Sequence, residues 1–185
     1  METKLISFKR VVKREKPVKR IGLDADFLVA ILGKEKDFDI FKPKIFNRNN
    51  VIFICQKVFA QALAVLTYKK QYSFDESKSK IFSFIKNYNI NIIKNKEIGF
   101  GRINSLVNEL KEKRKHIKAA PDDSDLEIIA IYKLSDIDCI STINSYHFEE
   151  LCSYLNIDVE KPIEDVNIMW NQVFKKKEGF KKKKP

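Results

Sequence analysis

Hydrophobic residues along the chain follow two spacings, one typical of buried strands and one typical of amphipathic helices. Short apolar runs predict four strands. The first ends at Asp24, the second lies at the beginning of residues 51–66, and the other two are residues 89–94 and 138–142. Helical spacing follows in the remainder of residues 21–32 and 51–66, in residues 72–88, 101–118 and 163–174, and after Asp122. Because strands alternate with helices, we predict an α/β fold, a three-layer sandwich with a central, mostly parallel sheet flanked by helices.

The chain reads as one domain between two basic ends. A length of 185 residues and a hydrophobic content of 44% are enough for one packed domain. We place this domain at residues 21–174, after a basic N-terminal tail at 1–20 and before a Lys-rich tail at 175–185. No apolar run reaches the length of a membrane span, no signal peptide is recognisable, and the three cysteines lack CxxC spacing. We therefore expect a cytoplasmic protein that does not enter a membrane.

Positive charge is concentrated in the two tails. Residues 1–20 carry a net charge of +6 and residues 175–185 another +6, whereas the whole chain carries +11, which leaves −1 for the domain. Basic tails are typical of proteins that contact nucleic-acid phosphates without reading the sequence, although lysine-rich solvated ends are also common. The candidate nucleic-acid contacts are Lys9, Arg10, Lys13, Arg14, Lys19 and Arg20 at one end, and Lys175, Lys176, Lys177, Lys181, Lys182, Lys183 and Lys184 at the other.

Polar side chains gather where predicted strands end and helices begin. They are Asp24 and Asp26 after the first strand, Asp122, Asp123 and Asp125 at a later helix start, and Thr142 and Asn144 after the strand at 138–142. In α/β proteins, functional groups meet at the carboxyl ends of the strands. Carboxylate and amide oxygens suit Mg²⁺ or Mn²⁺, and such ions can activate water for phosphodiester hydrolysis.

Each of these residues also has a purely structural interpretation. Asp24 and Asp125 are of a type that caps helices, because a carboxylate accepts the free N–H groups of the first turn. Asn144 fits a turn residue, and Gln61 fits a polar point on an apolar helix. We interpret His147 as a helix-start or surface residue, not as a base. A shared site is favoured because independent caps and turns do not predict that these residues meet at one sheet edge.

Three segments, taken in order, resemble a PIN-domain ribonuclease. The family's apolar strand, Asp and apolar helix resemble LDADFLVAIL, and its helix that presents a Glu resembles ICQKVFAQAL. The Asp-led helix, strand and closing Thr-x-Asp of the family resemble DLEIIAIYKLSDIDCISTINSYHF. The resemblance covers about Ile21 to Leu155 and leaves the tails and the helix expected at 163–174 outside it. It implies a PIN-like fold.

The resemblance also implies roles for individual residues. Asp24 would be the first metal ligand, Asp125 the acid at the helix start, and Thr142 the hydroxyl that orients the site. Two positions depart from the family pattern, since Gln61 stands where a Glu is expected and Asn144 where an Asp is expected. Amide oxygens can bind a metal but add no charge, so Mg²⁺ or Mn²⁺ would be held more weakly. Asp26, which we expect to cap the helix, and Asp122 or Asp123 could compensate.

The function that the resemblance implies is divalent-metal-dependent hydrolysis of RNA phosphodiester bonds by an endoribonuclease of weakened activity. The alternative is a catalytically inactive PIN-like protein that binds RNA or serves as a scaffold in a ribonucleoprotein complex. RNA is the expected partner in both cases. A protein partner such as an antitoxin and a homodimer are further expectations from the family.

Overall fold

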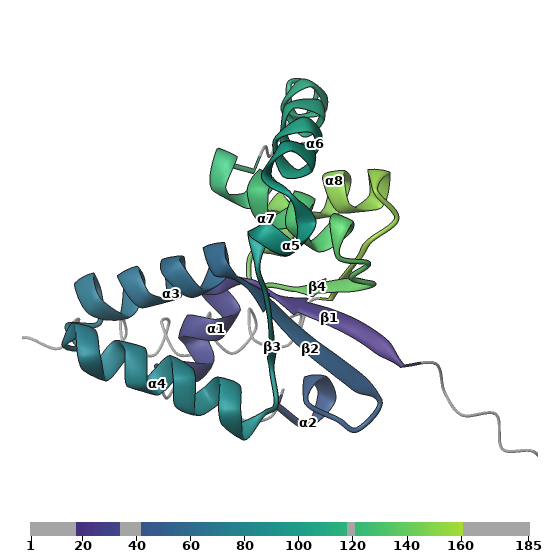
Figure 1. Cartoon of the computed structure of the whole chain (residues 1–185). Coiled ribbons are helices and arrows are strands. Elements are labelled where there is room, and N and C mark those ends of the chain that lie inside the picture. Colours follow the sequence, from purple (N-terminus) through teal and green to yellow (C-terminus); the bar gives the residue numbers. More distant parts are fainter. Residues whose placement is uncertain (1–17, 34–41, 118–120, 161–185) are drawn as a thin grey trace, which may run out of the picture.

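The computed structural model describes residues 18–33, 42–117 and 121–160 and shows one parallel sheet of five strands. The strand order is β3-β2-β1-β4-β5, with every neighbouring pair parallel (Figure 1). The strands are β1 at Lys19–Leu23, β2 at Asn50–Cys55, β3 at Asn91–Ile93, β4 at Cys139–Ser141 and β5 at Asp158–Glu160. The predicted α/β architecture with a parallel central sheet is therefore confirmed.

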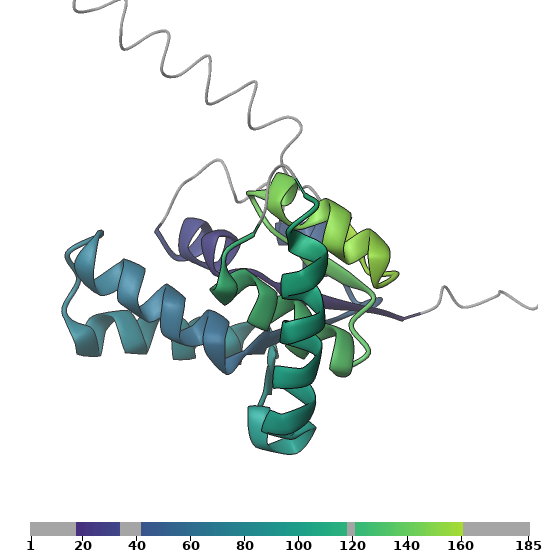
Figure 2. The ribbon, with the colours of Figure 1, turned by 90° about the horizontal axis from the view of Figure 1, so that it is seen from above.

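Helices connect successive strands and form two groups. The helices are α1 at Ala25–Leu32, α2 at Lys42–Ile45, α3 at Gln56–Tyr68, α4 at Phe74–Asn87, α5 at Asn95–Ile98, α6 at Phe100–Arg114, α7 at Asp123–Leu134 and α8 at Glu149–Tyr154. A short 3₁₀ turn, η2, lies at Ser145–His147. Figures 1 and 2 show α1, α3 and α4 together on one side and α6, α7 and α8 together on the other. The chain runs from β1 to β2 and β3 on one side of β1 and then crosses back to β4 and β5 on the other side, so right-handed crossovers place the two groups of helices on opposite faces of the sheet.

The core is built from apolar residues of the sheet and of the helix faces turned toward it. A close contact between β1 and α7 fixes their spacing, because the buried ring of Tyr132 lies against Gly22. A Cβ atom at Gly22 would lie 2.7 Å from a ring carbon of Tyr132. The Tyr132 hydroxyl donates a hydrogen bond to the Leu23 carbonyl, which satisfies this fully buried polar group. Glycine at this position therefore allows α7 to approach the strand that leads into Asp24.

The structure corrects the predicted boundaries of the domain. Lys19 and Arg20, which we assigned to the basic tail, are the first residues of β1. Arg20 donates a hydrogen bond to the Ser135 carbonyl at 3.1 Å, and its guanidinium lies 4.5 Å from the centre of the Phe53 ring. The sheet also ends later than expected, because residues 158–160 form β5, which the sequence analysis missed. The remaining tail residues and the helix expected at 163–174 lie outside the described residues.

No helix within residues 18–33, 42–117 and 121–160 is long and apolar enough to cross a membrane.

Candidate functional site

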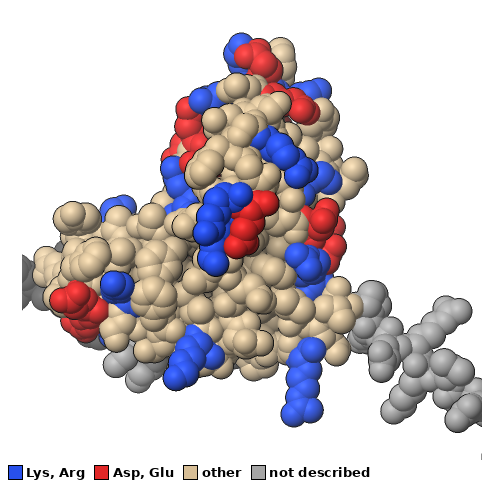
Figure 3. All heavy atoms as spheres, in the orientation of Figure 1, with Lys and Arg blue, Asp and Glu red and all other residues tan. Residues whose placement is uncertain are grey.

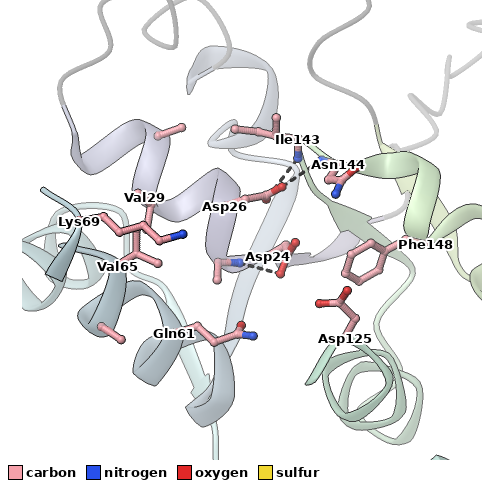
Figure 4. Close-up of a pocket in the computed structure, with 13 residues that line it drawn as sticks. Asp24, Asp26, Val29, Gln61, Val65, Lys69, Asp125, Ile143, Asn144 and Phe148 are labelled. Atoms are coloured by element: carbon pink, nitrogen blue, oxygen red, sulfur yellow. Dashed lines mark hydrogen bonds between the residues drawn. The ribbon is translucent and has the colours of Figure 1, made fainter. Parts of the chain in front are cut away.

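A cavity of about 550 Å³ opens at the carboxyl edge of the sheet. It is lined by polar side chains from four separate segments, namely Asp24, Asp26, Gln61, Lys69, Asp125 and Asn144. Apolar residues such as Val29, Val65 and Phe148 complete the wall (Figure 4). The strand order explains the convergence, since β1 and β4 are neighbours and end at the same edge. The structure thus places Asp24, Gln61, Asp125 and Asn144 around one cavity.

Asp24 is the most buried carboxyl group of this cavity, with 6% of its surface exposed. Its Oδ1 accepts a hydrogen bond from the Ala25 backbone N–H at 2.7 Å, and its Oδ2 accepts one from the Thr142 hydroxyl at 3.0 Å. Burial raises the pKa of Asp24 well above its usual value, and the charge of Asp26 raises it further. The two hydrogen bonds act in the opposite direction. The carboxyl group is thus buried, hydrogen-bonded and turned toward the cavity.

The roles expected for Asp24 and Asp26 are partly exchanged. Asp24 itself is the N-cap of α1, whereas Asp26, the residue we expected to be the cap, lies within the first turn. The carboxylate of Asp26 accepts hydrogen bonds from the backbone N–H groups of Ile143 at 3.2 Å and Asn144 at 2.9 Å. Asp26 therefore ties the segment after β4 to α1. The prediction that Asp26 caps the helix was wrong. Both aspartates are chemically suited to cap a helix, but the cap is the residue just before the first helical one, and α1 begins at Ala25.

Three aspartates at the start of α7 have three different environments. Asp122 is the N-cap, and its Oδ1 accepts hydrogen bonds from the backbone N–H groups of Ser124 and Asp125. Asp123 pairs with Lys111 and Arg114, with N–O distances of 2.7 Å in both cases, and these partners lower its pKa. Asp125 alone lines the cavity. Burial and the neighbouring Asp122 raise the pKa of Asp125.

Gln61 and Asn144 supply uncharged oxygens to the site. The amide nitrogen of Gln61 donates a hydrogen bond to the Ser124 hydroxyl at 2.8 Å, which orients the side chain between α3 and α7. Its Oε1 is buried and has no hydrogen-bond partner among the described residues. Figure 4 shows Asp24, Gln61 and Asp125 directed toward the same space, with Asn144 nearby. An unpaired buried acceptor costs free energy unless a ligand satisfies it.

Thr142 is buried behind the cavity, with 1% of its surface exposed. Its hydroxyl donates to Asp24 and also lies 3.2 Å from Asp26 Oδ2, and it accepts the Asn144 backbone N–H at 3.1 Å. Thr142 therefore joins the two aspartates of α1 to the end of β4. This placement agrees with the orienting role expected from the sequence, which stays a prediction.

Two residues near the site were not expected from the sequence. Lys69, at the end of α3, lines the cavity. Its spacing of eight residues from Gln61 on one helix is the signal that could have identified it. His147, which we interpreted as a helix-start or surface residue, lies at the end of η2 and is half buried. His147 does not line the cavity, but it lies close enough to Asp125 to oppose, in part, the rise in the pKa of Asp125 caused by burial and Asp122.

The side chains present fit a small divalent cation with oxygen ligands. Asp24 and Asp125 provide two carboxylates, and the orphaned Gln61 Oε1 provides a neutral oxygen. Mg²⁺ is usually held by one or two carboxylates together with water. Within the described part of the chain, no group of three or more His, Cys, Asp or Glu side chains is arranged to hold a metal. A cation in this cavity would therefore have few protein ligands and would keep several water ligands.

The surface outside the cavity shows no large area of one charge on the face seen in Figure 3. Lysine and arginine side chains are scattered over this face, and aspartate and glutamate side chains lie beside several of them. Among the described residues, several lysines pair with acids, such as Lys57 with Glu127 at 2.8 Å. This agrees with the nearly neutral charge of the domain calculated from the sequence.

Comparison with known proteins identifies the fold. No protein-family model matches the chain, and no curated protein matches it. Solved structures do match, among them VapBC2 from Rickettsia felis bound to a DNA fragment from their promoter, with 17% identity, a TM-score of 0.58 and coverage of 77% of this chain and 98% of that chain. VapBC-1 from nontypeable Haemophilus influenzae has 10% identity, a TM-score of 0.59 and coverage of 78% and 99%. FitAcB from Neisseria gonorrhoeae has 12% identity, a TM-score of 0.52 and coverage of 78% and 99%.

Proposed function

Because the chain has the PIN-like fold of these structures, we propose that it is a divalent-cation-dependent endoribonuclease that hydrolyses RNA phosphodiester bonds. The observation that carries this proposal is the position of the buried Asp24, which faces Asp125 and Gln61 in one open cavity. A fold alone does not imply a function, so the proposal depends on these side chains.

Asp24 and Asp125 would hold the cation, with Gln61 Oε1 as a neutral ligand. Two carboxylates in one cavity repel each other. Burial is the main cause that raises the pKa of both groups, and at Asp24 the charges of Asp26 and then Asp125 add to the rise. A bound cation removes the repulsion and keeps both groups ionised. When bound, Mg²⁺ or Mn²⁺ supplies an activated water nucleophile and stabilises the charge that develops on the phosphate oxygens.

The remaining residues of the site hold the proposed metal ligands in position. Thr142 holds Oδ2 of Asp24, and Asp26 holds the backbone of residues 143 and 144, so that the Asn144 side chain stays at the cavity. The Gln61–Ser124 hydrogen bond fixes α3 relative to α7. These contacts keep the first ligands in place before substrate arrives, which is the main contribution of the protein in metal-assisted hydrolysis.

The proposed activity is weak, because two expected acids are amides. The presence of these two amides also favours a second candidate function, a catalytically inactive PIN-like protein that binds RNA or acts as a scaffold. Neutral Gln61 and Asn144 lower the attraction for a cation without altering the shape of the site. The two functions differ in one measurable property, namely cleavage that depends on Asp24.

The deciding experiment incubates labelled single-stranded and hairpin RNA with the full chain in Mg²⁺, Mn²⁺ or EDTA. We expect cleavage in Mn²⁺ or Mg²⁺ that falls at least about 100-fold in Asp24→Asn, since electrostatic contributions at active sites have this size. Thermal melting with added Mn²⁺ gives a second readout, in which wild type is stabilised and Asp24→Asn is not. Cleavage that persists in EDTA and in Asp24→Asn would favour the inactive-scaffold function.

A protein partner such as an antitoxin, and a homodimer, are further parts of the proposal. They rest on the family resemblance, and the Rickettsia felis structure is described as VapBC2 bound to a DNA fragment from their promoter. Sedimentation equilibrium of the purified full chain tests the homodimer. A single monomeric species at high micromolar concentration would contradict it.

A further inference from the structure

The cavity contains a positive charge that the metal site does not require. Among the described residues that line it, Lys69 is the one basic side chain, against the carboxylates of Asp24, Asp26 and Asp125. Figure 4 shows the Lys69 side chain pointing into the cavity from the side opposite Asp125 and Phe148. The positive charge of Lys69 therefore lies inside the cavity.

Lys69 does not neutralise the acids of the cavity. Other lysines of the described chain form ion pairs, such as Lys57 with Glu127 and Lys111 with Asp123, but no carboxylate of the described residues lies within 4.0 Å of Lys69 Nζ. The ammonium group thus keeps its hydrogen-bond donors for a ligand. A lysine ammonium binds phosphate as a compact point charge.

The position of Lys69 along α3 separates it from the metal ligands. Gln61, Val65 and Lys69 follow each other at intervals of four residues, so they lie on the same face of the helix. Eight residues of α-helix extend about 12 Å. The stretch between the two polar residues is apolar, with Ala64 and Val65 lining the cavity. A strand lying along this face of α3 can therefore place one phosphate at Lys69 and a different one at Asp24 and Asp125.

We propose that Lys69 is a positioning residue for the substrate and binds a backbone phosphate adjacent in the strand to the one held at Asp24. This inference rests on the proposed ribonuclease function and describes how the same site would hold the RNA strand. An anionic strand that enters a cavity with three carboxylates is repelled, and a cation at the far end of the cavity offsets the repulsion and sets where the strand lies.

The test measures binding of a fluorescein-labelled single-stranded RNA to the full chain in the Asp24→Asn background, so that cleavage does not consume the probe. We expect Lys69→Met to weaken binding by about three- to tenfold and to lower the slope of log K against log salt by about 0.7, the value for one phosphate contact on a single strand. Lys69→Arg should restore both quantities, because it keeps the charge. In an otherwise wild-type chain, Lys69→Met should raise KM and change kcat little.

The matched control is Lys78→Met, which removes an exposed lysine of α4 that does not line the cavity. An equal loss of affinity in Lys78→Met and Lys69→Met would overturn the inference, because it would indicate non-specific attraction. Unchanged binding in Lys69→Met also overturns it. If cleavage depends on Asp24 but Lys69→Met binds RNA as tightly as the parent protein, the inference about Lys69 fails and the nuclease proposal stands. If RNA binds through Lys69 and no cleavage occurs, the nuclease proposal alone fails.

Discussion

The hydroxyl of Thr142, at the end of β4, donates a hydrogen bond to Oδ2 of Asp24 at the start of α1, over 3.0 Å and across 118 positions of sequence. Both residues are buried, so neither group can exchange this bond for one to bulk water. The backbone continues the same connection, since the Asp24 N–H donates to the Ser141 carbonyl at 2.9 Å. The candidate metal ligand is thus held by the neighbouring strand as well as by its own helix.

The first prediction concerns this hydrogen bond. Thr142→Val keeps the shape of the side chain but removes the hydroxyl, and it should lower the free energy of unfolding by about 1–3 kcal/mol because a buried carboxyl group loses a donor. It should also lower the rate of RNA cleavage. Urea denaturation gives the stability, and Thr142→Ser should keep most of it.

A neighbouring residue provides the matched control for Thr142. The hydroxyl of Ser141 is equally buried and has no hydrogen-bond partner among the described residues. Ser141→Ala should therefore be neutral or stabilising, within about 0.5 kcal/mol of wild type or above it. A loss in Ser141→Ala as large as that in Thr142→Val would show that the hydrogen bond to Asp24 is not the cause.

The second prediction concerns pH. Burial and the charge of Asp26 raise the pKa of Asp24 in the folded protein, so above the usual pKa of about 3.9 the folded state binds a proton that the unfolded state has lost. This contribution to stability decreases as the pH rises from that value through the raised pKa. Asp24→Asn keeps a capping side chain and removes the charge.

We therefore expect Asp24→Asn to melt a few degrees above wild type at pH 7.5 without metal, since ~1 kcal/mol shifts the Tm of a chain of this size by about 2–4 °C. The difference should shrink toward pH 4 and should also shrink when Mn²⁺ is added at pH 7.5. Calorimetry across this pH range measures it. A variant less stable than wild type at pH 7.5 would contradict the stated cost of the buried charge.

The third prediction restores a charge at Gln61. A glutamate there can accept a hydrogen bond from the Ser124 hydroxyl, so the α3–α7 contact survives with its direction reversed. Gln61→Glu should bind Mn²⁺ about tenfold more tightly, which is ~1.4 kcal/mol, and should cleave RNA faster. Titration calorimetry measures the affinity. Asn108→Asp, which adds the same charge on an exposed position of α6, should leave it unchanged.

The fourth prediction concerns the packing of β1 on α7. Gly22→Ala places a Cβ within 2.7 Å of the Tyr132 ring, so the ring or the helix must move. We expect a loss of about 1–3 kcal/mol in the free energy of unfolding, the usual cost of overpacking a core. Gly101→Ala, where a Cβ meets nothing within 4 Å, is the control and should not destabilise the protein. Equal Tm values for both variants would refute the packing argument.

The fifth prediction concerns the C-terminal tail. Residues 175–185 contain seven lysines and one glutamate, so their deletion should weaken RNA binding and lower its dependence on salt concentration. Fluorescence anisotropy at several salt concentrations measures both. An unchanged slope would mean that the tail does not contact RNA.

The sequence by itself determined the architecture, because strand and helix periods are local properties of the chain. The run ending at Asp24, the helix within residues 72–88 and the helix after Asp122 follow from residues close together in sequence. Parallel order then places Asp24, Asp125 and Asn144 at one edge. β5 was missed because Asp158–Glu160 has one apolar residue, and its pairing with β4 is a long-range contact.

Only the tertiary structure decided what each polar residue does. Asp24 and Asp26 are both chemically suited to cap α1. Asp24 is the cap because the helix begins at Ala25, and Asp26 instead accepts hydrogen bonds from the loop after β4. Lys69 and Arg20 both carry a positive charge, and the sequence does not distinguish their roles. In the structure, Lys69 lines the cavity and Arg20 packs on Phe53. The physical reason is that hydrogen bonds and charge contacts form across space, between residues whose distance along the chain carries no signal.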